Sequence, residues 1–258
     1  MARGAGWLAA MALVGAGRVM AQPADDDAAR KADLVMANHI LADLGVVDGF
    51  GHASVRSAAN PGHFFISRSL APELVSGADV VEVDAATCEA VSGQPRLYLE
   101  RFIHCAVYQA RPEVQAVVHN HSPGLIPFGV SGQVLRPVYH MAGFLGAGVP
   151  VFEIRSAGGA GTDMLIRSAP LGAALARRLG SGPMVLMRGH GATIVGSSLR
   201  QVVYRAVYAE RNGALQAEAM KLGPVTYLNP AEALGAARTN DEQLDRPWQL
   251  WVSHLKQR

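Results

Sequence analysis

The chain has 258 residues, of which 50% are hydrophobic and 17% charged, a balance typical of a folded globular protein and not of a disordered or fibrous one. Its 28 Gly and 14 Pro follow no period, which excludes collagen-like and solenoid architectures. Two cysteines are too few for a disulfide framework or a four-thiolate metal site.

The first 21 residues have the pattern of a cleaved secretory signal. An uncharged run, residues 4–17, follows a basic residue and is shorter than the about 20 apolar residues that cross a bilayer. Val19 and Ala21 place small side chains at the two positions that a signal peptidase reads. We therefore expect residues 1–21 to be a signal peptide, residues 22–258 to form a single domain, and the mature protein to be periplasmic or secreted. The alternative is an unstructured N-terminal extension.

Export would have consequences for charge, membrane contact and redox state. Removal of the segment leaves 21 basic and 21 acidic residues, without the basic and aromatic cluster that nucleic acid requires. No other stretch is long and apolar enough to hold the mature chain in a membrane. In an oxidising compartment Cys88 and Cys105 could pair, although their spacing does not show that they do. We expect Cys105, in a helical pattern, to be a small buried apolar side chain.

Helical and strand-like patterns alternate along the chain. In chain order, they predict a helix over 28–44, strands over 64–66 and 80–83, a helix over 98–110, strands over 115–121 and 149–154, a helix over 164–179, a strand over 184–187 and a helix over 199–222. This alternation indicates an α/β protein in which helices cover a central sheet. The tail after Asn240 contains Trp248 and Trp251, and we expect a short helix that docks on this chain or on a neighbour.

Two histidines in the strand over 115–121 carry the strongest chemical signal. Side chains alternate faces along a strand, so His119 and His121 project to the same side, about 6.6 to 7 Å apart along the backbone, and could bind one ion. Alone, such a pair could equally be one buried and one exposed histidine. His190 stands between two glycines after the strand over 184–187, and alone it would be a turn residue. As a third imidazole it would complete a catalytic metal site with open positions for water or substrate.

Glu100 and His104 stand four residues apart on the helix that precedes these histidines, so they share a face of it. A helix packed against the following strand can direct Glu100 toward the open positions of the ion. One alternative for Glu100 is a surface ion pair with Arg101. For His104, core packing or support of Glu100 is preferred over a role as fourth ligand.

Several motifs resemble, in order and spacing, those of the class II aldolase/adducin family. The resemblance runs from residue 32 to residue 222, and its motifs are residues 51–56, 100–104, 106–108, 111–114, 116–121 and 188–192. It implies a three-layer α/β/α sandwich with a central mixed sheet, assembled as a homotetramer with active sites at subunit interfaces. It also implies a divalent metal (Zn, Mn or Fe) held by His119, His121 and His190, with Glu100 as the catalytic acid/base.

The chain differs from the sugar-phosphate aldolases of this family where they bind phosphate. Those enzymes carry Gly-Asn-x-Ser-x-Arg and a Gly/Ser-rich loop, whereas this chain has His52 in place of the asparagine and Arg68 in the loop over 66–72. The planar guanidinium of Arg68 suits a carboxylate. We therefore expect His52, Ser54, Arg56 and Arg68 to bind a carboxylated small molecule. Alternatively, Arg68 pairs with an acid of this chain or of the next subunit.

Further segments resemble the branch of the family that decarboxylates hydroxy-aromatic dicarboxylates of the pyridine or phthalate type; they are residues 67–75, 126–130, 138–144 and 161–164. In this branch Tyr139 and His140 would be candidates for contacts from a neighbouring subunit. The expected function is that of a metal-dependent carbon–carbon lyase that decarboxylates a hydroxylated aromatic (di)carboxylate. The alternatives are a class II aldolase that cleaves a hydroxy-carbonyl substrate, an Fe(II) oxygenase, or a non-catalytic binding protein on the same scaffold.

Overall fold

A computed structural model describes Met1 and residues 26–257, so the predicted signal peptide lies outside the described residues. The strands are β1 (His52–Arg56), β2 (His63–Ser67), β3 (Val80–Asp84), β4 (Glu89–Ala90), β5 (Ala116–Asn120), β6 (Val151–Phe152), β7 (Met184–Met187) and β8 (Gly191–Gly196). The α-helices are α1 (Asp27–Asp43), α2 (Arg101–Ala110), α3 (Ile126–Val130), α4 (Arg155–Gly158), α5 (Ala169–Leu179), α6 (Leu199–Leu222), α7 (Pro230–Asp241) and α8 (Asp245–Leu255). Three 3-10 helices are η1 (Pro72–Leu74), η2 (Gly77–Asp79) and η3 (His140–Leu145).

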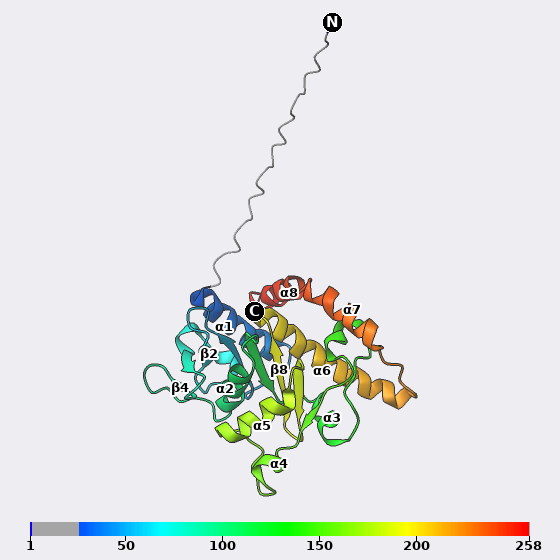
Figure 1. The fold of residues 1–258 in the computed structure, drawn as a ribbon, viewed down its shortest axis with the longest axis horizontal. Coiled ribbons are helices and arrows are strands. Elements are labelled where there is room, and N and C mark those ends of the chain that lie inside the picture. The colour runs from blue at the N-terminus through cyan, green and yellow to red at the C-terminus, as the bar shows by residue number, and fades with distance from the viewer. Residues whose placement is uncertain (2–25, 258) are drawn as a thin grey trace.

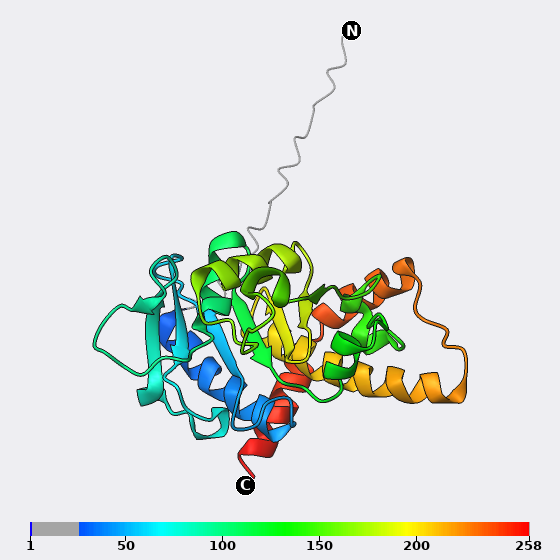
Figure 2. The same cartoon turned by 90° about the horizontal axis from the view of Figure 1, so that it is seen from below.

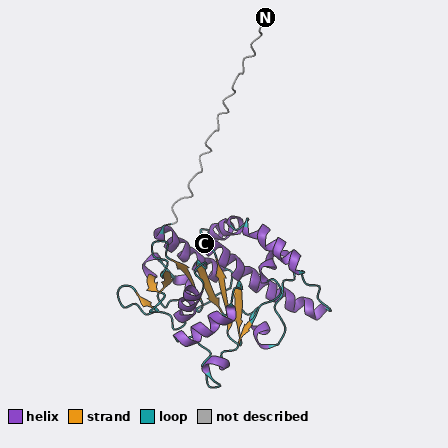
Figure 3. Ribbon diagram, viewed as in Figure 1, coloured by secondary structure: helices purple, strands orange, loops and turns teal. Residues whose placement is uncertain are grey.

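The strands form one mixed sheet in the order β4-β3-β2-β1-β5-β8-β7-β6. The β6–β7 pair is parallel, and the other pairs are antiparallel. The strands lie at the centre of the molecule with helices around them (Figure 3). The central mixed sheet expected from the sequence is therefore confirmed.

Alternating side chains pack the two faces of this sheet against different helices. On β2, Phe65 joins the core formed with α1, α6 and α8, whereas Phe64 and Ile66 join the core formed with α2 and α5. Burial of each such side chain stabilises the fold by about 1.5–3 kcal/mol. Figure 1 shows the fold and its element labels, and Figure 2 shows α5 on one side of the strands and α1 and α8 on the other. The predicted three-layer α/β/α arrangement is confirmed.

Most predicted elements occur, with differences at their ends. The helix over 199–222 is confirmed, and the strand predicted over 149–154 contains only two paired residues. The helix predicted over 164–179 begins at Ala169, because the chain before it is extended and the backbone N–H of Ile166 donates to a carboxylate elsewhere in the fold. Strands β1, β4 and β8 were not predicted.

The C-terminal helix predicted after Asn240 is α8, and it docks on this chain. Its Trp248 and Trp251 side chains are buried in the core that also contains residues of α1 and α6. Within residues 26–257, no helix has both the length and the apolar character of a membrane span.

Cys88 and Cys105 form a disulfide, with their Cα atoms 5.8 Å apart. The bond ties the turn between β3 and β4 to the middle of α2. Cys105 is buried, as expected from its helical pattern. The pairing that its spacing left open does occur, because the fold brings Cys88, 17 residues away, within bonding distance.

Candidate metal centre and its pocket

His119 and His121 meet at the end of β5. His119 lies on the sheet face covered by α2 and is fully buried, and His121 is the first residue after the strand. The chain turns there, so the two Nε2 atoms come within 3.1 Å of each other. The structure thus brings together the two imidazoles that the strand periodicity placed on one side.

His190 reaches the same point from the turn between β7 and β8. Gly189 has a φ of +62°, and a Cβ atom at Gly191 would overlap the backbone oxygen of Asn120. Both glycines are needed for the turn to lie against the end of β5. Nε2 of His190 consequently lies 2.9 Å from Nε2 of His121.

Backbone carbonyls orient two of the three rings. Nδ1 of His119 lies 3.0 Å from the oxygen of Ala192, and Nδ1 of His190 lies 2.8 Å from the oxygen of Met164. A carbonyl can only accept, so each Nδ1 carries the ring proton and donates it. The Nε2 lone pairs of both rings are therefore left to bind a metal, which is how metal-ligating histidines are usually held.

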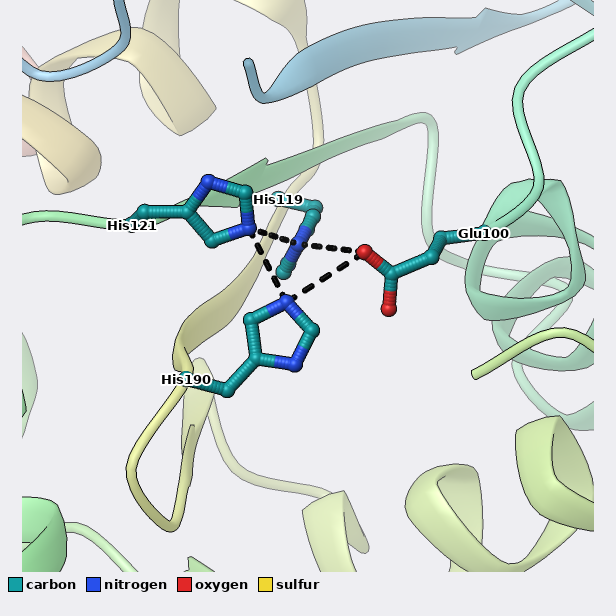
Figure 4. A group of neighbouring side chains, drawn as sticks. All are labelled: Glu100, His119, His121 and His190. Atoms are coloured by element: carbon teal, nitrogen blue, oxygen red, sulfur yellow. Dashed lines mark hydrogen bonds and ion pairs between the residues drawn. The ribbon is translucent and has the colours of Figure 1, made fainter. Parts of the chain in front are cut away.

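Glu100 closes the fourth side of the cluster from the N-terminus of α2. One carboxylate oxygen accepts from the N–H of Ile166 at 2.9 Å, and the other lies 3.3 Å from Nε2 of both His119 and His190. Figure 4 shows the four side chains pointing toward one another. Glu100 is the residue directly before α2, so it caps the helix on which the sequence placed it together with His104.

The charges of the cluster depend on one another. Burial by itself would raise the pKa of Glu100, but His119 and His190 hold it well below its usual range. Desolvation together with His119 and His190 lowers the pKa of His121 to about 4. Burial opposes protonation of His190, but Glu100, which accepts a hydrogen bond from Nε2 when the ring is protonated, raises its pKa overall. At neutral pH an ionised carboxylate therefore faces the imidazoles.

The donor set fits a divalent cation. The ligand atoms of Glu100, His119, His121 and His190 all lie within 4.8 Å of one another. An ion with 2.0–2.1 Å bonds at tetrahedral angles holds its nitrogen ligands roughly 3.3 Å apart, close to the 2.9 and 3.1 Å observed here. Imidazole and carboxylate ligands suit Zn, Mn and Fe alike.

A cavity of about 410 Å³ opens beside this cluster, and Glu100 and His121 form part of its wall. His52 also lines it, as expected for a ligand-binding residue. Phe50 and Leu99 present apolar side chains that are 71% and 59% exposed. The cavity therefore joins the candidate metal centre to both polar and apolar surface.

The structure places the other predicted binding residues away from this cavity. Ser54 is fully buried under α2. Arg56 is also buried, and its guanidinium donates to the carbonyls of Val114, Pro61, Tyr108 and Arg111. Arg68 pairs with Asp79 at 2.6 Å, which is the alternative weighed for it, and it does not line the cavity.

Two further predicted residues and His104 also lie outside the cluster. His140 lines a separate groove formed by η3, α6 and α8, and Tyr139 precedes it. In one chain neither residue reaches the histidines; a contact made from a neighbouring subunit stays a prediction. His104 hydrogen-bonds to His52 and Ser54, so it supports the site and is not a fourth ligand.

Arg96 is the cavity residue that the sequence did not single out. Its carbonyl accepts from the N–H of Ser69 at 2.7 Å, but its exposed side chain makes neither a hydrogen bond nor an ion pair with any described residue. It stands four positions before Glu100 in a segment without regular structure, so no periodic pattern marks it. The exposed Phe50, between two glycines, was equally unmarked.

Comparisons with known proteins agree on one family. The family model described as class II aldolase and adducin N-terminal domain matches residues 32–217. "Decarboxylase tropJ" of Talaromyces stipitatus is 40% identical over 242 residues, which cover 84% of this chain and 91% of that protein. The 3,4-dihydroxyphthalate decarboxylase of Arthrobacter keyseri is 27% identical over 208 residues, covering 74% and 78%. The fold resembles that of L-fuculose 1-phosphate aldolase from Glaciozyma antarctica PI12, with a TM-score of 0.73, 24% identity and coverage of 89% and 90%.

Proposed function

Because this chain belongs to the class II aldolase and adducin family, we propose that it is a divalent-metal-dependent carbon–carbon lyase that decarboxylates a hydroxylated aromatic carboxylate. The observation that carries the proposal is the convergence of the Nε2 atoms of His119, His121 and His190 beside the carboxylate of Glu100. Decarboxylation is preferred to aldol cleavage because the relatives that match the largest shares of this chain, 84%, 78% and 74%, are decarboxylases.

Decarboxylation and retro-aldol cleavage share one requirement, since both leave an electron pair on carbon. A divalent ion bound by the three histidines would act as a Lewis acid toward a carbonyl or phenolate oxygen of the substrate. The imidazoles are neutral ligands, so they do not reduce the charge of such an ion. Glu100 lies 3.3 Å from two of the ring nitrogens, so it would stand close to a substrate oxygen bound at that ion.

Glu100 moves the proton in this proposal. Its carboxylate is ionised at neutral pH, which is the form that can accept the proton of a substrate hydroxyl. When the carbon–carbon bond breaks and carbon dioxide leaves, the same proton is donated to the carbon that held the carboxylate. The N–H of Ile166 keeps the second carboxylate oxygen in place throughout.

The cavity wall suits an aromatic acid. Arg96 offers an unpaired guanidinium, which binds carboxylates through two parallel hydrogen bonds. Phe50 and Leu99 provide exposed apolar surface for an aromatic ring. We infer that a substrate carboxylate, other than the one that is lost, binds Arg96.

The direct test is release of carbon dioxide from a set of hydroxy-aromatic mono- and dicarboxylates, with a chelator-treated sample as the control. We expect release with at least one ortho-hydroxylated acid, and loss of it after metal removal. Aldehyde release from hydroxy-carbonyl substrates without carbon dioxide release would favour an aldolase. Oxygen consumption that depends on substrate would favour an oxygenase.

We further propose that the protein acts after export, as a homotetramer. The disulfide between Cys88 and Cys105 supports an oxidising compartment, because such bonds are rare in the reducing cytosol. N-terminal sequencing of protein from a secreting host should begin at Gln22, and light scattering should give four times the mass of the processed chain. An uncleaved protein in the cytosol would contradict the proposed export, and a monomer would contradict the proposed homotetramer.

A further inference from the structure

A row of hydrogen-bonded side chains leads from the cavity into the layer between β1 and α2. Nδ1 of His52 lies 2.7 Å from Nε2 of His104, and Nδ1 of His104 lies 2.6 Å from Oγ of Ser54. The same Oγ lies 2.8 Å from the hydroxyl of Tyr108. All four side chains are at most 4% exposed, so bulk water does not compete for these bonds. We call this row the Tyr108–His52 chain.

The number of protons in this chain is fixed. Burial lowers the pKa of His104 to about 3, so its imidazole is neutral at neutral pH. Its Nε2 lies 2.7 Å from Nδ1 of His52, so only one proton lies between the two rings. Each ring then carries one N–H, and Ser54 and Tyr108 carry one O–H each. Three of these four protons can lie in the three hydrogen bonds, and one remains outside them. The open question is which group is the donor in each bond.

One direction satisfies every buried donor. The hydroxyl of Tyr108 donates to Ser54, Ser54 donates to Nδ1 of His104, and Nε2–H of His104 donates to Nδ1 of His52. The proton of His52 then resides on Nε2, which has no hydrogen-bond partner among the described residues. Because His52 lines the cavity and its Nδ1 is already bonded, Nε2–H is the donor left for a ligand.

The other directions leave a buried donor unpaired. If His52 donated to His104 and the order were reversed, the hydroxyl of Tyr108 would have no acceptor, since Ser54 is its only hydrogen-bond partner in the described part of the chain. If His104 and Tyr108 both donated to Ser54, the proton of Ser54 would have none. Buried donors without acceptors are rare in folded proteins because they lose their hydration.

We propose that the Tyr108–His52 chain holds His52 in the tautomer with its proton on Nε2, and that this N–H donates to an anionic oxygen of the ligand bound beside the candidate metal centre. His52 is thereby a ligand-binding residue, and His104, Ser54 and Tyr108 are positioning residues that act through it. The identity of the ligand rests on the proposed function, whereas the tautomer does not.

The first test measures the tautomers directly, in zinc-loaded protein labelled with ¹⁵N in its histidines. Two-bond ¹H–¹⁵N correlations distinguish a ring protonated on Nε2 from one protonated on Nδ1. We expect both His52 and His104 to carry the proton on Nε2. A proton on Nδ1 of His52, or a doubly protonated ring at pH 7, would overturn the proposal without any variant being made.

The second test asks whether His104 sets this tautomer. In His104→Leu the donor to His52 is lost, so we expect a mixture of His52 tautomers. In His104→Gln the side-chain amide supplies a donor close to the position of Nε2, so we expect the Nε2–H form to be retained. A purely structural role for His104 predicts the same tautomer of His52 in both variants, and that outcome would remove His104 from the set of positioning residues.

The third test measures ligand binding, with 3,4-dihydroxybenzoate as the probe and metal content as a second readout. We expect His52→Phe to weaken binding about 10- to 100-fold, the range for a hydrogen bond to a charged group, without loss of zinc. His52→Gln should recover most of the affinity. His63→Gln is the matched control, because His63 on β2 bonds to Glu82 of β3 and does not line the cavity.

The outcomes separate this inference from the proposed function. If the wild type binds the probe and His52→Phe binds it equally well, the ligand-binding role of His52 is wrong. If the wild type binds no hydroxy-aromatic acid and releases no carbon dioxide from any of them, the proposed function fails. The NMR measurement still decides the tautomer in that case.

Discussion

Glu100 is held by a backbone N–H on one side and faces the imidazoles on the other, so its replacement can separate chemistry from metal binding. We expect Glu100→Gln to keep its metal, because His119, His121 and His190 remain. Turnover should fall by about 10² to 10⁴, the usual contribution of a positioned acid or base. Metal analysis and the rate of carbon dioxide release on the same sample measure both. A rate near that of the wild type would reassign Glu100 as a structural residue.

Two arginines near the cavity differ in whether their charge is already paired. We expect Arg96→Gln to raise KM about 10- to 100-fold with a smaller change in kcat, because it removes a charge-assisted hydrogen bond to the substrate. Arg68→Gln is the matched control and should change KM much less, since Arg68 pairs with Asp79 outside the cavity. Equal effects of the two changes, measured by steady-state kinetics, would contradict this assignment.

The residues of the candidate site differ in how far the sequence could reveal them. His119 and His121 follow from strand periodicity, because two residues of one strand keep a fixed local geometry. Arg68 and Arg96 both lie outside regular elements, and their distance from the histidines depends on how the whole chain folds. The sequence therefore favoured Arg68 for its chemistry, whereas the structure places Arg96 in the cavity wall.

At the scale of elements, β1 shows why a strand can be missed. Its residues alternate, with Ala53 and Val55 on one face and His52, Ser54 and Arg56 on the other. A polar face usually meets solvent, but here it is buried under α2 and satisfied by hydrogen bonds. The same sequence pattern is equally typical of a ligand-binding loop. Only the packing of α2 on the polar face shows that the segment is a buried strand.

The disulfide between Cys88 and Cys105 fixes the helix that begins next to Glu100. For a loop of this length, 17 residues, the bond should stabilise the folded state by about 3 kcal/mol. We expect the double variant Cys88→Ser, Cys105→Ala, which leaves no free thiol, to have a free energy of unfolding about 3 kcal/mol lower in urea denaturation. Its metal content should not change. An unchanged unfolding free energy would show that α2 needs no covalent support.

At the scale of the whole molecule, the layers could be predicted because helices and strands alternate in the sequence, whereas the order of strands could not. The sheet places β1 beside β5, so that His52 stands opposite His119. Their separation of 67 residues along the chain gives no local signal of this pairing. Such contacts depend on sheet topology and not on the pattern of any one segment.

Buried neutral imidazoles make the stability of the whole fold depend on pH. The folded-state pKa of His104 is about 3, against 6.5 when it is exposed. Between these values the unfolded chain binds a proton that the folded chain does not, so this contribution to stability is complete above pH 6.5 and is lost as the pH falls toward 3.

We therefore expect the free energy of unfolding of the metal-free protein to fall between pH 7 and pH 5, with about 2 kcal/mol of the loss due to His104. Urea denaturation at the two pH values measures this difference. In His104→Leu the difference should be smaller by that amount, whatever the stability of the variant at pH 7. An identical difference in both proteins would show that His104 does not contribute.

The four donors of the candidate metal centre are far apart in the sequence. During synthesis Glu100 is added first, then His119 and His121, and His190 last. A ribosome has made about three quarters of the polypeptide before the last of them exists. No partial product shorter than 190 residues contains the complete set, so a metal ion that needs all four donors would bind late in synthesis or after it. If the four donors bind a metal ion, the compartment in which the chain folds would therefore determine which ions are available to it.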